Sequence, residues 1–274
     1  HIAEQGVGVL ASAAIVGGVL VAMLFGRRQR KLADPLIDLR LFRVPAFSTA
    51  LATFTLGTLI VFGAYIFIGQ YLQLVLGLSP LEAGLWMLPS SLGFIIGSMA
   101  APALGRRVRP ALVMGVGLAL AALGFALLAF VEQIGLPGLV AAALVYSLGL
   151  APVFTLGTDL IVGSAPPERA GAAAAMSETA SELGGALGIA TLGSLGSAVY
   201  RSAMTDASLS GVSEQTREVA RDTLGGAAAA AAHLPEPLGS ELLDTARHAF
   251  SHALIVTAGL CALLAVVAAV ISLV

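Results

Sequence analysis

The sequence predicts an all-α membrane protein, a polytopic bundle of about seven transmembrane helices. Hydrophobic residues make up 58% of the 274 residues and charged residues only 11%, and the mean hydropathy is +0.95. A soluble domain carries about 25% charged residues. The apolar residues also gather into long runs, each able to cross a hydrocarbon core of about 30 Å as a helix. Because the runs lack the polar alternation of transmembrane strands, a β-barrel is not expected.

Charged or turn-forming segments separate seven apolar stretches. They cover residues 6–25, 47–76, 81–104, 111–131, 139–163, 170–200 and 253–274. The second and third stretches form one uncharged run that is too long for a single span, so a break is needed. Ser79 can cap a new helix, Pro80 suits its first turn and Glu82 completes an S-x-x-E capping box.

Basic residues alternate between successive loops, which predicts the orientation of the chain. The loops after the first, third and fifth spans carry Lys or Arg, whereas the loops at residues 77–80 and 132–138 carry none. Basic loops lie on the cytoplasmic side of membranes. We therefore expect a multi-pass protein of the plasma membrane with His1 outside and Val274 in the cytoplasm.

Two segments between spans carry structure of their own. Residues 34–43 mix charged and apolar side chains, which is typical of a short helix at the membrane interface. The 201–248 loop has four arginines and seven acidic residues and is expected outside. A helix over 213–232, a turn at 235–237 and a new helix from 240 predict a helical hairpin on the outer face, with a mobile loop as the alternative.

Several function classes lack support in the sequence. The net charge of −2 gives no indication of a nucleic-acid partner, and the single cysteine, Cys261, excludes an internal disulfide. Enzyme motifs such as H-E-x-x-H, G-x-S-x-G and the P-loop are absent, so no catalytic residue and no cofactor is predicted. His248 and His252 lie four residues apart, but two ligands alone are weak grounds for a metal site.

Acidic residues inside the apolar spans are the strongest functional signal. Asp159, Glu178 and Glu182 fall within the predicted spans, where a charge costs about 2.5–3.5 kcal/mol on insertion scales. Glu178 and Glu182 share one helix face with Ser177 and Ser181, which predicts a polar stripe turned toward the bundle interior. Such carboxyl groups can exchange protons and attract lipophilic cations. Glu178 could instead lie near the headgroups, and Asp159 could be a gate or a boundary residue.

Other residues suggest a substrate path and close helix packing. Tyr65 and Gln70, near the outer end of the second span, could line such a path, whereas Tyr71 could equally belong to an interfacial aromatic belt. Gly184 and Gly188 form a G-x-x-x-G, which lets helix backbones approach closely. Gly193 precedes Ser197 at the same spacing.

Four stretches resemble the major facilitator superfamily, specifically its fourteen-span drug:proton antiporter group. They are residues 34–43, residues 77–89, residues 97–110 and residues 167–188. In the third, Arg106, Arg107 and Arg109 are similar to a degenerate copy of the family's basic cytoplasmic loop motif. In the fourth, Glu178 and Glu182 match membrane-embedded acids of the penultimate span.

The resemblance implies that this chain is spans eight to fourteen, the C-terminal half of a major facilitator fold. Residues 1–26 would then form one helix of a central linker pair, 27–46 a cytoplasmic linker, and 47–274 a six-helix domain. The N-terminal half of the same transporter would be the partner, and it would carry the antiporter motif that this chain lacks.

The predicted function is proton-coupled efflux of lipophilic, cationic drugs by alternating access. Glu178 and Glu182 would exchange protons, with Asp159 assisting or gating. The partners would be the drug, protons and the lipid bilayer. Two alternatives remain: a non-transporting membrane scaffold, which would not need the acid pair, and a transporter of the same fold with a different substrate.

Overall fold

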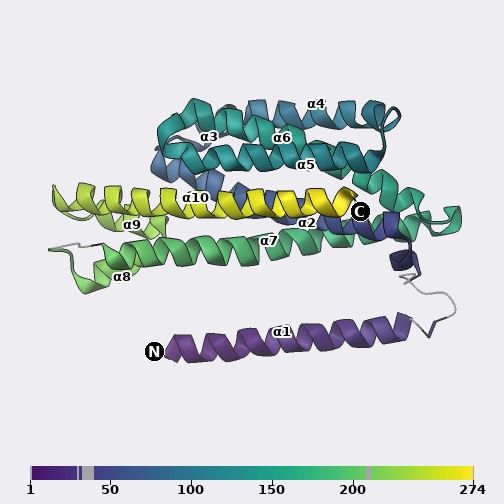
Figure 1. The fold of residues 1–274 in the computed structure, drawn as a ribbon. Helices are drawn as coiled ribbons and strands as arrows, with labels where there is room; N and C mark the ends of the chain where they lie inside the picture. The colour runs from purple at the N-terminus through teal and green to yellow at the C-terminus, as the bar shows by residue number, and fades with distance from the viewer. Residues whose placement is uncertain (1, 30, 33–39, 208–210, 274) are drawn as a thin grey trace.

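The structure, a computed structural model, describes residues 2–29, 31–32, 40–207 and 211–273, without the side chains of residues 2–12, 14 and 15. Within these ranges the chain is helical and contains no strand, which confirms the predicted all-α fold (Figure 1). The helices are α1 (Ile2–Gln29), α2 (Pro45–Gln70), α3 (Pro80–Trp86), α4 (Leu88–Gly105), α5 (Pro110–Leu127), α6 (Val131–Gly163), α7 (Ala170–Asp206), α8 (Glu214–Asp222), α9 (Leu224–Ala231) and α10 (Leu238–Leu273).

Shorter helical turns join some of these helices. They are the 3₁₀ turns Leu41–Arg43, Leu128–Phe130 and Pro167–Arg169 and the π turn Tyr71–Val75. The predicted interfacial helix at 34–43 lies mostly outside the described residues, and its described end contains the first 3₁₀ turn.

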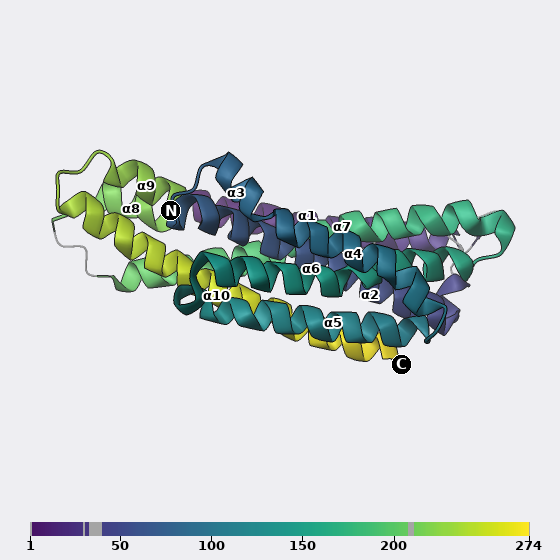
Figure 2. The same cartoon turned by 90° about the horizontal axis from the view of Figure 1, so that it is seen from above.

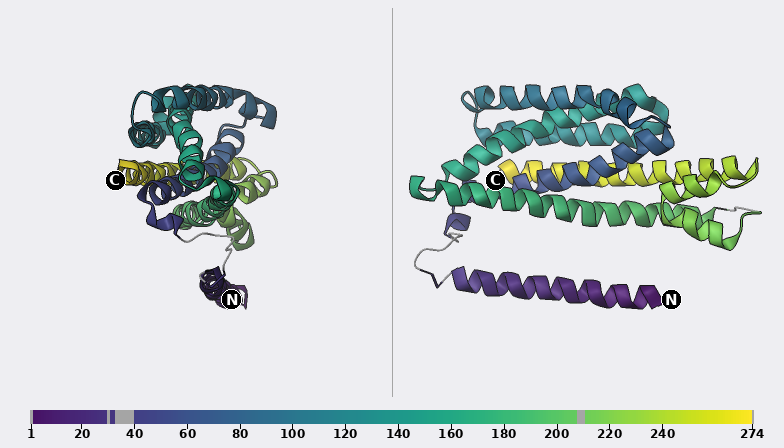
Figure 3. Two further views of the ribbon diagram at one scale, coloured as in Figure 1. Left: turned by 90° about the vertical axis from the view of Figure 1, so that its right-hand side faces the viewer. Right: turned by 180° about the vertical axis from the view of Figure 1, so that it is seen from behind.

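Five described stretches are long and apolar enough to cross a membrane. One of them, Pro110–Gly163, changes direction near Gly135, whose φ of 60° interrupts the helical backbone, so α5 and α6 run side by side. Figure 3 shows α1 apart from the other helices. Because several described stretches can each cross a membrane, the chain is a multi-pass membrane protein.

The break between α2 and α3 has the predicted capping box. The Glu82 backbone N–H donates to Ser79 Oγ at 3.3 Å, and the Ser79 backbone N–H donates to Glu82 Oε2 at 2.9 Å. Pro80 opens α3, where its missing N–H is no loss. These bonds satisfy backbone groups that a new helix would otherwise leave unpaired.

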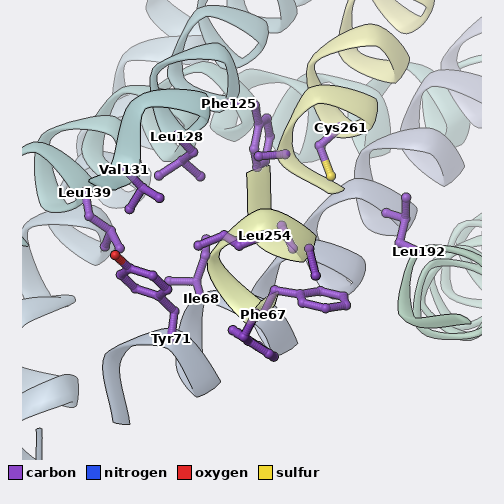
Figure 4. Packing of buried hydrophobic residues seen from close by; sticks show 14 of the residues in the cluster. Phe67, Ile68, Tyr71, Phe125, Leu128, Val131, Leu139, Leu192, Leu254 and Cys261 are labelled. Atoms are coloured by element: carbon purple, nitrogen blue, oxygen red, sulfur yellow. The ribbon is translucent and has the colours of Figure 1, made fainter. Parts of the chain in front are cut away.

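The helices pack in two groups, which are joined by α10 and by contacts of α6 with α2 and α7. In one group α4 and α5 both pack along α6, and in the other α2 packs along α7. Helix α10 contacts α5, α2 and α7, and Figure 2 shows α5 and α10 side by side. Buried apolar side chains from α2, α5, α6 and α10 fill the space between the groups (Figure 4). They include Phe67, Phe125, Leu139, Leu254 and Cys261.

The segment before α10 differs from the single helix predicted at 213–232. The structure has two helices there, because Thr223 adopts an extended backbone with φ −153° and ψ 153°. Thr223 Oγ1 then accepts from the Gly226 N–H at 3.0 Å and caps α9. Tyr200 of α7 donates its hydroxyl proton to the Ala220 carbonyl at 2.8 Å, which ties α8 to α7.

Candidate functional site

A groove of about 650 Å³ opens on the face formed by α2, α4, α6 and α7. This volume is in the range of small-molecule sites, about 300–1,000 Å³. The lining described by the structure is aromatic, aliphatic and hydroxyl-bearing, and contains no charged side chain. The groove can therefore accept a mainly apolar molecule with a few hydrogen-bonding groups.

Hydroxyl groups line one wall of the groove. Ser90 of α4 and Ser147 of α6 are buried, and their Oγ atoms lie 3.1 Å apart. Tyr146 precedes Ser147 on α6 and also lines the groove. These residues were not singled out from the sequence. The only sequence signal is a polar residue within an apolar span, and many serines in this chain share that property.

Aromatic side chains supply much of the remaining surface. Phe94 of α4 and Phe154 of α6 lie with ring centroids 5.9 Å apart. Phe62 and Tyr65 enter from α2, and Tyr65 is 73% exposed. The structure thus places Tyr65 in the groove. Gln70, the other residue predicted for a substrate path, is partly buried at the end of α2 and does not line the groove.

Helix α7 approaches α2 through the predicted glycine pair. A Cβ at Gly184 would lie 2.5 Å from the Thr55 carbonyl oxygen, and one at Gly188 would meet the Leu59 carbonyl oxygen. The close packing predicted from G-x-x-x-G is therefore present. A Cβ at Gly193, in contrast, would meet nothing within 4 Å, whereas one at Gly196 would meet the Phe67 ring.

The two glutamates of α7 do not point into the interior of the described bundle. Ser177 is buried and Ser181 lines the groove, but Glu178 and Glu182 are exposed. The predicted inward stripe is wrong for both carboxylates, because the glycine face of α7 is the one that packs on α2. Ser181 nevertheless places the groove beside Glu182, the next residue along the chain.

Asp159 and the three arginines lie away from this groove. Asp159 is exposed near the end of α6 and is not part of the lining. Arg106, Arg107 and Arg109 are exposed in the turn between α4 and α5. The structure therefore brings Tyr65 and Ser181 together and leaves the remaining predicted residues on other surfaces.

The sequence profile described as Major Facilitator Superfamily matches residues 5–189. This chain belongs to the major facilitator superfamily. The superfamily consists of transporters, which agrees with the helical membrane fold and with an open groove between helices.

Similar superfamily members include proteins named for drug efflux and resistance. The multidrug efflux pump LfrA of Mycolicibacterium smegmatis is 40% identical over 270 residues, which cover 98% of this chain and 53% of LfrA. The methyl viologen resistance protein SmvA of Salmonella typhimurium is 35% identical over 242 residues, 86% of this chain and 48% of SmvA. The chain spans about half the length of these relatives.

A third relative is named for resistance to one natural product. The tetracenomycin C resistance and export protein of Streptomyces glaucescens is 35% identical over 184 residues, which cover 66% of this chain and 34% of that protein. Relatives of similar sequence thus differ in the compounds in their names, so the match alone does not identify a substrate for this major facilitator chain.

Proposed function

We propose that this chain is the C-terminal half of a drug exporter that exchanges lipophilic cations for protons by alternating access. Residues 1–26 would belong to a central helix pair, 27–46 to a cytoplasmic linker, and 47–274 to a six-helix domain with an outer hairpin at 201–248. The groove between α2, α4, α6 and α7 carries the proposal, because it combines drug size with an aromatic surface.

The groove lining favours a flat or lipophilic substrate. Aromatic faces of Phe62, Tyr65, Phe94 and Phe154 can contact apolar rings, and such faces also attract cations. The hydroxyls of Ser90 and Ser147 can orient a polar substituent. The names of two relatives, a multidrug efflux pump and a methyl viologen resistance protein, support drug export as the activity.

Glu178 and Glu182 are proposed to couple substrate movement to protons. Both lie on the part of α7 that does not pack on α2, next to the groove-lining Ser181. An N-terminal half that covered this face would enclose both carboxylates beside the substrate groove, where acidic side chains within membrane spans commonly serve as proton relays. Asp159, on α6, would have a gating or pairing role instead.

Proton movement driven by substrate tests this proposal. The full-length protein would be reconstituted in vesicles, and proton release would be recorded after addition of a lipophilic cation. We expect Glu178→Gln and Glu182→Gln each to reduce coupled release by about tenfold, because the coupling free energy between two ligands is typically about 1–3 kcal/mol and ~1.4 kcal/mol corresponds to tenfold. Glu168→Gln, an exposed acid in the turn before α7, is the matched control and should retain release.

Three other outcomes would contradict the proposal. Unchanged release in both α7 variants would make these carboxylates structural. Reduced release in Glu168→Gln as well would show a general effect of charge near α7. Absence of release in the wild-type protein would favour the scaffold or a transporter with a different substrate.

A further inference from the structure

A separate groove of about 370 Å³ opens between α4 and α5. Its lining is almost entirely apolar, and α6 contributes Leu148 and Pro152. No hydroxyl or charged side chain belongs to the lining that the structure describes. In this respect it differs from the groove that contains Ser90 and Tyr65.

The helix packing explains why this groove exists. Helices α4 and α5 follow each other in the chain, but each packs along α6 far more extensively than on its neighbour (Figure 1). Gly97 brings α4 close to α6, since a Cβ there would lie 2.8 Å from the Leu148 carbonyl oxygen. Gly117 brings α5 against the Gly149 carbonyl. With both helices held on α6, the space between them stays open along its apolar floor.

One end of the groove is the turn that carries the three arginines. Leu104 and Val108 belong to the groove lining, and the Leu104 carbonyl accepts from the Arg107 and Val108 N–H groups, both at 2.9 Å. This tight turn leaves Arg106 and Arg107 exposed beside the end of the groove, whereas Arg109, also exposed, lines a separate pocket with residues of α2 and α10. None of these arginines forms an ion pair with another described residue.

We propose that this groove binds one anionic phospholipid, with an acyl chain between α4 and α5 and the phosphate at Arg106 and Arg107. The apolar lining matches a hydrocarbon chain, and the two exposed guanidinium groups match the charge of the headgroup. Arginine also offers paired N–H donors to phosphate oxygens. Because the groove is apolar and the turn at its end is positively charged, the site favours an anionic phospholipid over a zwitterionic lipid or an apolar drug.

Lipid titration of the full-length protein in detergent, followed by native mass spectrometry, tests the proposal. The probes would be phosphatidylglycerol, phosphatidylcholine and glycerol 3-phosphate. We expect one tightly bound phosphatidylglycerol, much weaker phosphatidylcholine, and no retained glycerol 3-phosphate, because the free headgroup lacks the chain that fills the groove.

Two variants examine the two ends of the site independently. Replacing Arg106 and Arg107 by alanine should weaken phosphatidylglycerol binding about thirtyfold, which is about 2.1 kcal/mol at 1.4 kcal/mol per tenfold and close to ~1 kcal/mol per basic residue at an anionic surface. Ala100→Trp should weaken it at least about tenfold by filling the groove, since Ala100 is exposed and lines it.

Matched controls separate site occupancy from general effects. Replacing Arg27 and Arg28, which are exposed at the end of α1, removes positive charge elsewhere. Leu123→Trp introduces the same indole side chain at an exposed position of α5 outside the groove. Both controls should bind phosphatidylglycerol as the wild type does. Equal retention of phosphatidylcholine, or full binding by either the double-alanine variant or Ala100→Trp, would overturn the proposal.

Discussion

Substitution of Gly184 by alanine should separate α7 from α2. The new Cβ would lie 2.5 Å from the Thr55 carbonyl oxygen and would also meet Thr58 Oγ1. Carbon–oxygen contacts are ordinarily about 3.3–3.6 Å, and a backbone carbonyl in a helix cannot rotate aside. The two helices must therefore move apart by about 1 Å, and overpacking of this kind costs roughly 1–3 kcal/mol.

Gly193→Ala is the matched control, because it lies on the same helix and its new Cβ would meet nothing within 4 Å. Both substitutions gain the same helix propensity, about 1 kcal/mol, so this gain cancels when the two variants are compared. The difference between their free energies of unfolding should be about 1–3 kcal/mol, with Gly184→Ala less stable.

Reversible unfolding of the full-length protein in mixed detergent micelles would measure this difference. If the two variants unfold within about 0.5 kcal/mol of each other, as neutral surface substitutions do, the α2–α7 contact is not as close as the structure shows. The reasoning from helix packing would then be wrong.

Two further predictions concern hydrogen bonds outside the grooves. Ser79→Ala removes the acceptor of the Glu82 N–H and should lower the free energy of unfolding by about 1 kcal/mol, measured by the same denaturation; no change would show that α3 does not depend on its cap. Tyr200→Phe leaves the Ala220 carbonyl without its buried donor and should cost about 1–3 kcal/mol. Tyr200→Phe should also speed amide hydrogen exchange in α8, whereas Tyr65→Phe, at an exposed position, should not. Equal exchange rates in the two variants would contradict the role of the Tyr200 hydrogen bond.

Periodicity and local chemistry were enough to predict much of the fold. The division between α2 and α3 follows from Ser79, Pro80 and Glu82, because a capping box is formed by residues within one turn of each other. The small face at Gly184 and Gly188 was predicted for the same reason, since four-residue spacing is a property of any α-helix. These local signals do not identify the helix that packs against the glycine face.

The wrong expectation that Glu178 and Glu182 point inward shows what local sequence patterns cannot determine. The sequence indicates that the two carboxylates share a face, but not which face of α7 contacts α2. Two features of α7 could turn inward, the glycines and the acids, and the structure selects the glycines because they allow the close approach to Thr55 and Leu59. The carboxylates consequently lie on the exposed part of the helix.

The sequence by itself determined that the chain is an α-helical membrane protein of the major facilitator type, because hydropathy and motif residues are properties of short segments. Only the tertiary structure decided which residues form the two grooves. Ser90 and Ser147 are 57 positions apart, and their contact depends on how α4 packs on α6. The turn that carries the arginines lies beside an apolar groove only because α4 and α5 both pack on α6. No short sequence pattern determines that packing.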